Sequence, residues 1–182
     1  MKKNKMTRLA AFLLISAGLT LSAGVKAQDS KQAKIIADSK EAKAEFIQKD
    51  ELMKSLFENS YGYVIFPNVG KGAIGVGGAA GNGIVFQKEN VLGTAKMKQV
   101  SVGFQFGGQA YREVIFFENA EALDRFKGNK FEFSAQASAV AATKGASANV
   151  KYRDGVMVFT QQKGGLMYEA SIGGQKFSYK PL

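Results

Sequence analysis

The sequence predicts an α+β fold: N-terminal helices pack on a Gly-rich, mostly antiparallel, barrel-like β-sheet that carries one short inserted helix. Of the 21 Gly, only Gly18 and Gly24 precede residue 61, and residues 28–60 contain no Gly and no Pro. Each Gly costs a helix about 1 kcal/mol relative to Ala, so helices are favoured before residue 61 and disfavoured after it. Several later segments alternate apolar and polar residues, which is the period of a half-buried strand.

Residues 1–27 have the pattern of a cleavable secretory signal peptide. Four basic side chains and no acid precede an apolar run over residues 9–21, and small residues surround a cleavage position after Ala27. A membrane anchor would need about 20 apolar residues, and this run is shorter. We therefore expect an exported protein, periplasmic or associated with the cell envelope. The sequence has no Cys, so it is not expected to be a lipoprotein.

The remaining residues, 28–182, suffice for a single domain with its own core. Within residues 28–60, two helices are expected, over residues 30–48 and after Asp50, which we interpret as the N-cap of the second. Apolar stripes mark the buried side of each helix. The first stripe contains Ala33, Ile36, Ala44 and Ile47, and the second contains Leu52, Met53, Leu56 and Phe57.

Residues 61–182 are expected to be mainly β. The first strand covers residues 61–66 and ends at Pro67, and a turn at 79–82 separates strands 73–78 and 83–87. Further strands are predicted at 100–106, 112–117 and 131–137, with Asn119 capping a short helix at 120–126. The chain then forms a meander of strands at 149–152, 156–161, 166–171 and 175–179, with its first turn at Asp154 and Gly155.

The residue types exclude much of enzyme chemistry. Without His or Cys, Ser-His-Asp and Cys-His catalysis and the usual zinc sites are absent. Glu118, Glu121 and Asp124 could supply an acid–base pair, but an acidic first turn favoured by the helix dipole explains them as well. We expect no enzyme activity, no metal and no cofactor.

Gly70, Gly72 and Gly75 match the G-x-G-x-x-G spacing of dinucleotide-binding loops. That fingerprint requires a helix directly after it, whereas the residues that follow lead into a hairpin. We therefore interpret these glycines, together with Phe66, Pro67 and Gly77, as a structural motif that lets strands approach closely or bend.

Four segments carry a resemblance to a known family: YGYVIFPNVGKGAIGVGGAA at residues 61–80, SVGFQFGGQ at 101–109, FEFSAQAS at 131–138 and KGGL at 163–166. Together with the strand-then-helix step at 113–126, they resemble the SYLF-domain family, in the family's order and over nearly all of residues 28–182. The resemblance implies a lipid-binding module. Eukaryotic members bind phosphoinositides through an amphipathic N-terminal helix and basic residues, and no catalytic residues are established.

The charge distribution departs from that helix-centred picture. Residues 28–60 contain six Lys and seven acids, a net charge of −1, whereas residues 61–182 contain 14 Lys and Arg and 8 acids, a net charge of +6. The mildly basic total suits an anionic membrane surface and does not argue for nucleic acid. Candidate lipid- or membrane-binding residues therefore lie in the β part: Lys71, Lys96, Lys98, Lys127, Lys130, Lys144, Lys151 and Arg153.

The favoured function is a non-enzymatic exported protein that binds lipid or an anionic membrane surface. A structural or protein-interaction role with an envelope protein as partner is the alternative, because aromatic, Gly-rich strands can add to the sheet edge of another protein. A small outer-membrane barrel also stays open, since residues 73–86 and 100–111 loosely imitate barrel strands.

Overall fold

The computed structural model describes residues 6–74, 76–100, 110–134, 137–163 and 169–182. The chain divides into two compact units, residues 1–34 and residues 35–182. Residues 6–34 are helical throughout and form the first part of α1 (Met6–Lys49). In the described part of the chain, no helix combines the length and apolar character that crossing a bilayer requires.

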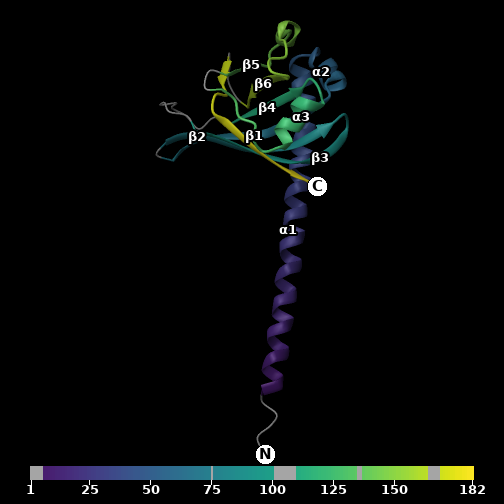
Figure 1. Ribbon diagram of the computed structural model, residues 1–182, viewed down its shortest axis with the longest axis vertical. Coiled ribbons are helices and arrows are strands. Elements are labelled where there is room, and N and C mark those ends of the chain that lie inside the picture. The colour runs from purple at the N-terminus through teal and green to yellow at the C-terminus, as the bar shows by residue number, and fades with distance from the viewer. Residues whose placement is uncertain (1–5, 75, 101–109, 135–136, 164–168) are drawn as a thin grey trace, which may run out of the picture. The chain divides into compact units, whose positions relative to one another are not determined.

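Residues 35–182 are built on one eight-stranded sheet with the order β7-β5-β6-β4-β1-β2-β3-β8 (Figure 1). Neighbouring strands are antiparallel except β5 and β6, which are parallel. The α+β prediction is thus confirmed, and β7 and β8 are the edges of the sheet. The strands are β1 (Gly62–Ile74), β2 (Val76–Gln87), β3 (Asn90–Val100), β4 (Ala110–Phe117), β5 (Ser138–Ala141), β6 (Val156–Gln162), β7 (Glu169–Ser171) and β8 (Gln175–Pro181).

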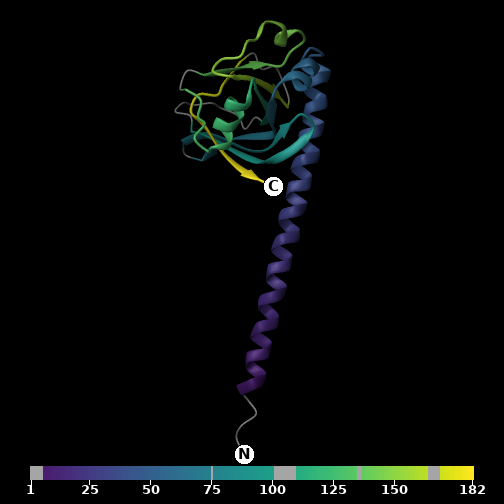
Figure 2. The ribbon, with the colours of Figure 1, turned by 45° about the vertical axis from the view of Figure 1, so that its right-hand side comes forward.

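The sheet curls strongly around an inner core (Figure 2). Although β1 and β8 are three strands apart, the ring centroids of Phe66 on β1 and Phe177 on β8 lie 5.7 Å apart. The inserted helix α3 (Ala120–Lys127) packs on this inner face through Leu123 and Phe126. Its predicted cap is confirmed, because Asn119 accepts a hydrogen bond from the Ala122 amide at 3.0 Å.

The outer face of the sheet is covered by residues 35–49 of α1 and by α2 (Met53–Asn59). Phe57 on α2 makes edge contacts with Tyr63 and Phe116, with centroid distances of 5.0 and 4.8 Å. An ion pair of 2.6 Å between Arg112 on β4 and Glu45 adds a polar contact between helix and sheet. The helices therefore shield one apolar face of the sheet, and α3 helps to fill the other.

The predicted helix stripes were partly wrong. Within residues 28–49 of α1, the fully buried positions are Ser39, Ala42 and Phe46, whereas Ala33 and Ala44 are exposed. On α2, Met53 and Phe57 are buried, but Leu52 is 50% exposed. Asp50 is not the N-cap of α2, since Leu52 holds that position. The spacing of apolar residues is compatible with burial of more than one side of each helix. Contact with the sheet determines which side is buried.

The prediction that the first strand ends at Pro67 is wrong, because β1 continues to Ile74. The register with β2 and with β4 shifts around Pro67, between Ile65 and Asn68 and between Phe66 and Val69. Pro has no amide hydrogen to donate, and a bulge leaves one residue outside the ladder. The Phe-Pro pair thus marks a bulge inside a long strand.

The strand boundaries that follow also differ from the expectation. Residues 79–82 are not a turn but the middle of β2, and β3 was not anticipated. Most of the predicted strand at 100–106 lies outside the described residues; Val100 is the last residue of β3. In β3, buried Ala95 and Met97 alternate with exposed lysines. Ala and Lys are uncommon in strands, so this part of the sequence did not indicate one.

The predicted C-terminal meander is wrong, although β4, α3, β6 and β8 lie close to their predicted positions. β8 pairs with β3 and not with β7, and β5 lies parallel to β6. Residues 131–134 form one isolated bridge, at Glu132. Residues 149–152 form no strand: Asn149 ends the 3-10 turn η1 (Ala146–Asn149), and residues 150–152 follow it without regular structure. Alternation shows where a strand lies but not which strand pairs with it.

Candidate binding groove and lysine face

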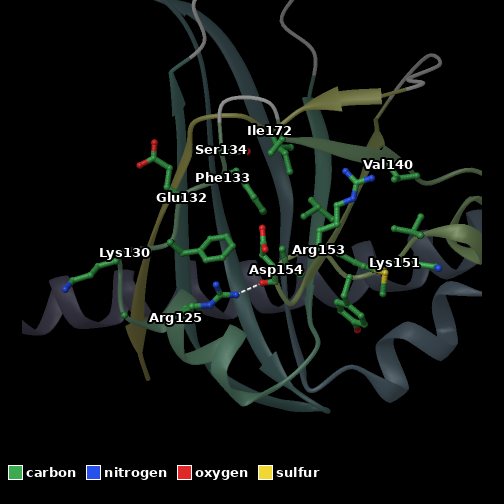
Figure 3. Close-up of a pocket in the computed structure, with 18 of the residues that line it drawn as sticks. Arg125, Lys130, Glu132, Phe133, Ser134, Val140, Lys151, Arg153, Asp154 and Ile172 are labelled. Carbon is green, nitrogen blue, oxygen red and sulfur yellow. Dashed lines mark hydrogen bonds between the residues drawn. The ribbon is translucent and has the colours of Figure 1, made fainter.

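A partly open groove with a volume of about 1300 Å³ lies at one side of the sheet (Figure 3). Four parts of the chain form it: the segment from α3 to Ser134, residues 137–140 with β5, the segment 149–154 that leads into β6, and β6 itself with Ile172. We call this site the groove. Its volume exceeds the roughly 300–1,000 Å³ that is typical of small-molecule binding sites.

The floor of the groove is apolar. It includes side chains from the apolar clusters on both faces of the sheet. Val156 and Val158 of β6 belong to the cluster on the inner face, and Met157 belongs to the cluster beneath α1 and α2. Aromatic and aliphatic side chains extend the floor on either side: Phe131, Phe133, Val150, Tyr152 and Ile172. An apolar floor of this kind favours a ligand with a hydrocarbon part.

The rim of the groove is basic. Arg125, Lys130, Lys151 and Arg153 contribute four positive charges, against two negative charges from Glu132 and Asp154. All six side chains belong to exposed residues. Lys130 extends away from the centre of the groove in Figure 3, while Arg125 reaches towards Asp154.

A tight turn positions the arginines of the rim. Arg153 and Val156 exchange backbone hydrogen bonds of 2.9 and 3.0 Å, and Asp154 and Gly155 between them have φ angles of 50° and 76°. This is the predicted Asp-Gly turn. The Arg125 guanidinium donates to the Asp154 carbonyl oxygen and so joins α3 to the turn.

A second basic surface lies on the outward side of β3 and β8. Side chains alternate along both strands, so Lys96 and Lys98 are exposed between buried neighbours, as is Lys176 beside buried Phe177. Lys98 lies directly opposite Lys176, an arrangement that costs stability because like charges repel. We call the surface formed by Lys96, Lys98, Lys176 and Lys180 the lysine face.

The groove and the lysine face meet at one ion pair. Glu132, on the rim of the groove, lies 3.4 Å from the Lys176 ammonium. That pair neutralises one of the two acids of the rim, so the basic character of both surfaces continues across it.

The predicted site residues fall into separate places. Lys130, Lys151 and Arg153 meet at the groove, and Lys96 and Lys98 form part of the lysine face. Three basic residues of these surfaces were missed: Arg125, Lys176 and Lys180. Lys176 and Lys180 alternate with Phe177 and Tyr179 in the sequence, a signal that could have revealed them.

Three predicted residues join neither surface in the described structure. Lys127 pairs with Asp124 at 2.9 Å, and this hydrogen bond raises the pKa of the lysine. Lys144 is exposed in the segment after β5 and does not line the groove. Lys71 lies in β1 opposite Ala79, but its side chain is outside the described part.

The structure explains part of the motif that the sequence analysis interpreted as structural. Phe66 is buried against Phe177, and Pro67 occupies the bulge. Gly72 and Gly77 lie in the β1–β2 ladder, opposite Gly78 and Ala73, and Gly75 lies outside the described residues. Those of them that the structure describes do not line the groove, and their purely structural role stays a prediction.

The acidic residues around α3 do not converge on a reaction site. Glu118, Glu121 and Asp124 are exposed, and Asp124 pairs with Lys127. Among the described residues, no group of three or more acidic side chains could hold a metal ion. The geometry therefore supports binding through an apolar floor and a basic rim.

Comparison with known proteins finds similarity in part of the chain. A family model described as "Ysc84: Las17-binding protein actin regulator" matches residues 98–180. The chain is also similar to beta cell expansion factor A of Aeromonas veronii, at 28% identity over 125 residues, which cover 68% of this chain and 48% of that protein. The chain thus spans about half the length of that relative. Both matches agree with the resemblance to the SYLF-domain family, whose members are generally non-enzymatic.

Proposed function

We propose that this protein is an exported, non-enzymatic protein that binds an anionic amphiphile, a lipid with an acidic headgroup, at a membrane surface. The observation that supports the proposal best is the groove, in which an apolar floor lies beneath a rim of four basic residues. Family members bind lipids or protein partners, which fits a ligand of this kind.

Two contributions would combine in such binding. A hydrocarbon chain on the groove floor gains about 0.8 kcal/mol for each methylene group removed from water. The anionic headgroup is attracted by Arg125, Lys151 and Arg153 on the rim. The lysine face next to the groove would rest on anionic lipids, where each lysine contributes about 1 kcal/mol.

The groove is tested with dodecyl sulfonate, a single-chain amphiphile whose charge is constant over the usual pH range. Calorimetric titration below its micelle concentration compares the wild type with Lys151→Glu/Arg153→Glu. We expect the double variant to bind at least about tenfold more weakly, since the headgroup loses two attractive charges and meets two repulsive ones.

The matched control is Lys40→Glu/Lys49→Glu, which changes the same charge on exposed positions of α1. It should bind as the wild type does. Equal loss in both variants would show only general electrostatic attraction, and no binding to the wild type would refute the lipid proposal.

Export has its own test. Intact mass of the protein recovered from the envelope fraction of an expressing bacterium should correspond to a chain that begins at Gln28. A retained N-terminus would contradict cleavage after Ala27 and would favour an anchored protein.

A protein partner is the second candidate function. It is favoured by the description of the matching family model, which names a protein-binding activity in other members. Flotation with protein-free anionic vesicles separates the two candidates, because a protein-directed surface would leave the chain at the bottom of the gradient. Attachment to the vesicles that weakens as salt rises would favour lipid.

A further inference from the structure

A buried glutamate lies inside the curled sheet, away from both basic surfaces. Glu113 on β4 is 0% exposed, and its side chain shares the inner face with Tyr111. Its Oε2 accepts a hydrogen bond from Gln175 Nε2 on β8 at 3.0 Å, although four positions in the strand order separate β4 from β8. Its Oε1 has no hydrogen-bond partner among the described residues.

Among the described residues, the groups that face Glu113 offer no compensating charge. Across the ladders its neighbours are Phe66 on β1 and Thr160 on β6. Gln175 on β8 also approaches Gln99 on β3 and Tyr111 on the strand of Glu113 itself. Burial raises the pKa of Glu113 to about 7, against which the Gln175 hydrogen bond acts. Burial also raises the pKa of Tyr111, so its phenol is neutral.

Gln175 connects this carboxyl group to the groove. Its carbonyl oxygen accepts a hydrogen bond from the Phe133 amide at 3.1 Å, and the Phe133 carbonyl accepts one from Gly174 at 3.1 Å. The backbone amide of Gln175 donates a hydrogen bond to the Ile172 carbonyl oxygen at 3.1 Å. Phe133 and Ile172 both line the groove. One residue therefore holds Glu113 with its side chain and the groove wall with its backbone.

We propose that ligand binding in the groove is linked to a proton on Glu113: the sheet closes over the neutral carboxyl group, whereas its ionisation favours an opened β8 that admits water to the carboxylate and so loosens the groove wall. The proposal rests on the groove being the lipid site. An ionised carboxylate with one donor in an apolar interior is costly, and the cost falls when water reaches it, even at the loss of the Gln175 hydrogen bond. β8 is an edge strand with only one neighbour in the sheet, so it is the element that yields first.

The test measures the affinity for dodecyl sulfonate at about pH 5.5 and about pH 8.5, on either side of the Glu113 pKa. We expect wild-type binding to weaken by roughly five- to tenfold at the higher pH, a usual size for coupling between sites. Glu113→Gln, which resembles the protonated form, should bind equally at both values. The matched control Glu58→Gln removes an exposed carboxylate of α2 and should keep the wild-type pH dependence.

Persistence of the pH dependence in Glu113→Gln would overturn the proposal, and so would its absence from the wild type. Hydrogen exchange without ligand supplies a second measurement that needs neither the variant nor the lipid site. Protection factors of the Phe133 and Gly174 amides in the wild type should fall above pH 7, while that of Ile65, which pairs with both β2 and β4, stays constant. Unchanged protection at Phe133 and Gly174 would refute the link, whereas lack of ligand binding at both pH values would refute only the lipid site.

Discussion

The carboxylate of Asp50 accepts two hydrogen bonds from Ser147, one from its amide at 2.9 Å and one from its hydroxyl at 2.6 Å. The two residues are 97 positions apart in the sequence. Asp50 lies between α1 and α2 and also accepts the Leu52 amide at 3.2 Å. Ser147 belongs to η1, and the chain continues from η1 into the groove wall at residues 149–154. This contact therefore joins the helical pair to one side of the groove.

Replacement of Asp50 by Ala should destabilise the protein by about 2–4 kcal/mol, because charge-assisted hydrogen bonds are lost and buried donors stay unpaired. Urea unfolding at neutral pH measures the change. Glu51→Ala, at the exposed neighbouring position, is the control and should alter stability by less than about 0.5 kcal/mol. Equal effects at the two positions would show that the contact with Ser147 contributes nothing specific.

The same contact predicts sensitivity to acid. Burial alone would raise the pKa of Asp50, but the hydrogen bonds from the Ser147 hydroxyl and from backbone amides outweigh it and lower the pKa. A carboxyl group with a lowered folded pKa stabilises the fold above its unfolded pKa, and this stability is lost as pH falls through the folded value. The stability difference between the wild type and Asp50→Asn should therefore shrink below about pH 4.

Glu113 should give stability the opposite dependence on pH. Its pKa is raised from 4.5 to about 7 in the fold. The folded state then holds the proton more tightly, so this stabilisation is complete below the unfolded pKa and declines as pH rises through the folded one. The stability of Glu113→Gln relative to the wild type should increase by on the order of 1–3 kcal/mol between about pH 5 and about pH 8. Urea unfolding at several pH values checks this, and a constant difference would contradict it.

Two strand glycines should differ sharply in their tolerance of a side chain. A Cβ at Gly83 would lie 2.5 Å from the Ile65 carbonyl oxygen and 2.7 Å from Phe66 Cδ1, whereas a Cβ at Gly70 would meet nothing within 4 Å. Gly83→Ala should lower stability by about 1–3 kcal/mol, because backbone and a buried ring must move. Gly70→Ala should change it by less than about 0.5 kcal/mol. Thermal unfolding of both variants measures the contrast, and similar melting temperatures would contradict the close approach of β1 and β2.

Charge reversal tests which part of the molecule meets a membrane. Lys96→Glu/Lys98→Glu/Lys151→Glu alters the lysine face and the rim of the groove, and Lys31→Glu/Lys40→Glu/Lys49→Glu alters three exposed positions of α1. Each lysine near an anionic surface contributes about 1 kcal/mol, so the first variant should bind anionic vesicles more than tenfold less tightly. Co-sedimentation with vesicles measures the affinity. A greater loss in the α1 variant would show that the helix makes the membrane contact.

Local chemistry explains which features the sequence alone could predict. The distribution of Gly separated the helical from the β part, because a helix penalises Gly wherever it occurs. Asn119 and the pair Asp154 and Gly155 act on their immediate neighbours, so the cap and the turn were predicted correctly. The basic character of the β part followed from counting charges.

Long-range pairing decided the remaining features. Alternation in β8 showed which of its faces is apolar, but its partner β3 depends on how the whole sheet curls. The groove unites Arg125 with Lys151 and Arg153 because the turn at Asp154 docks on α3. Glu113 looked like an ordinary strand glutamate, and only the curl that brings Gln175 across the interior made it a buried acid. Sequence alone determined the division into a helical and a β part, the Asn119 cap and the Asp-Gly turn; the fold decided which charges are buried and which meet, because burial depends on residues far apart in the chain.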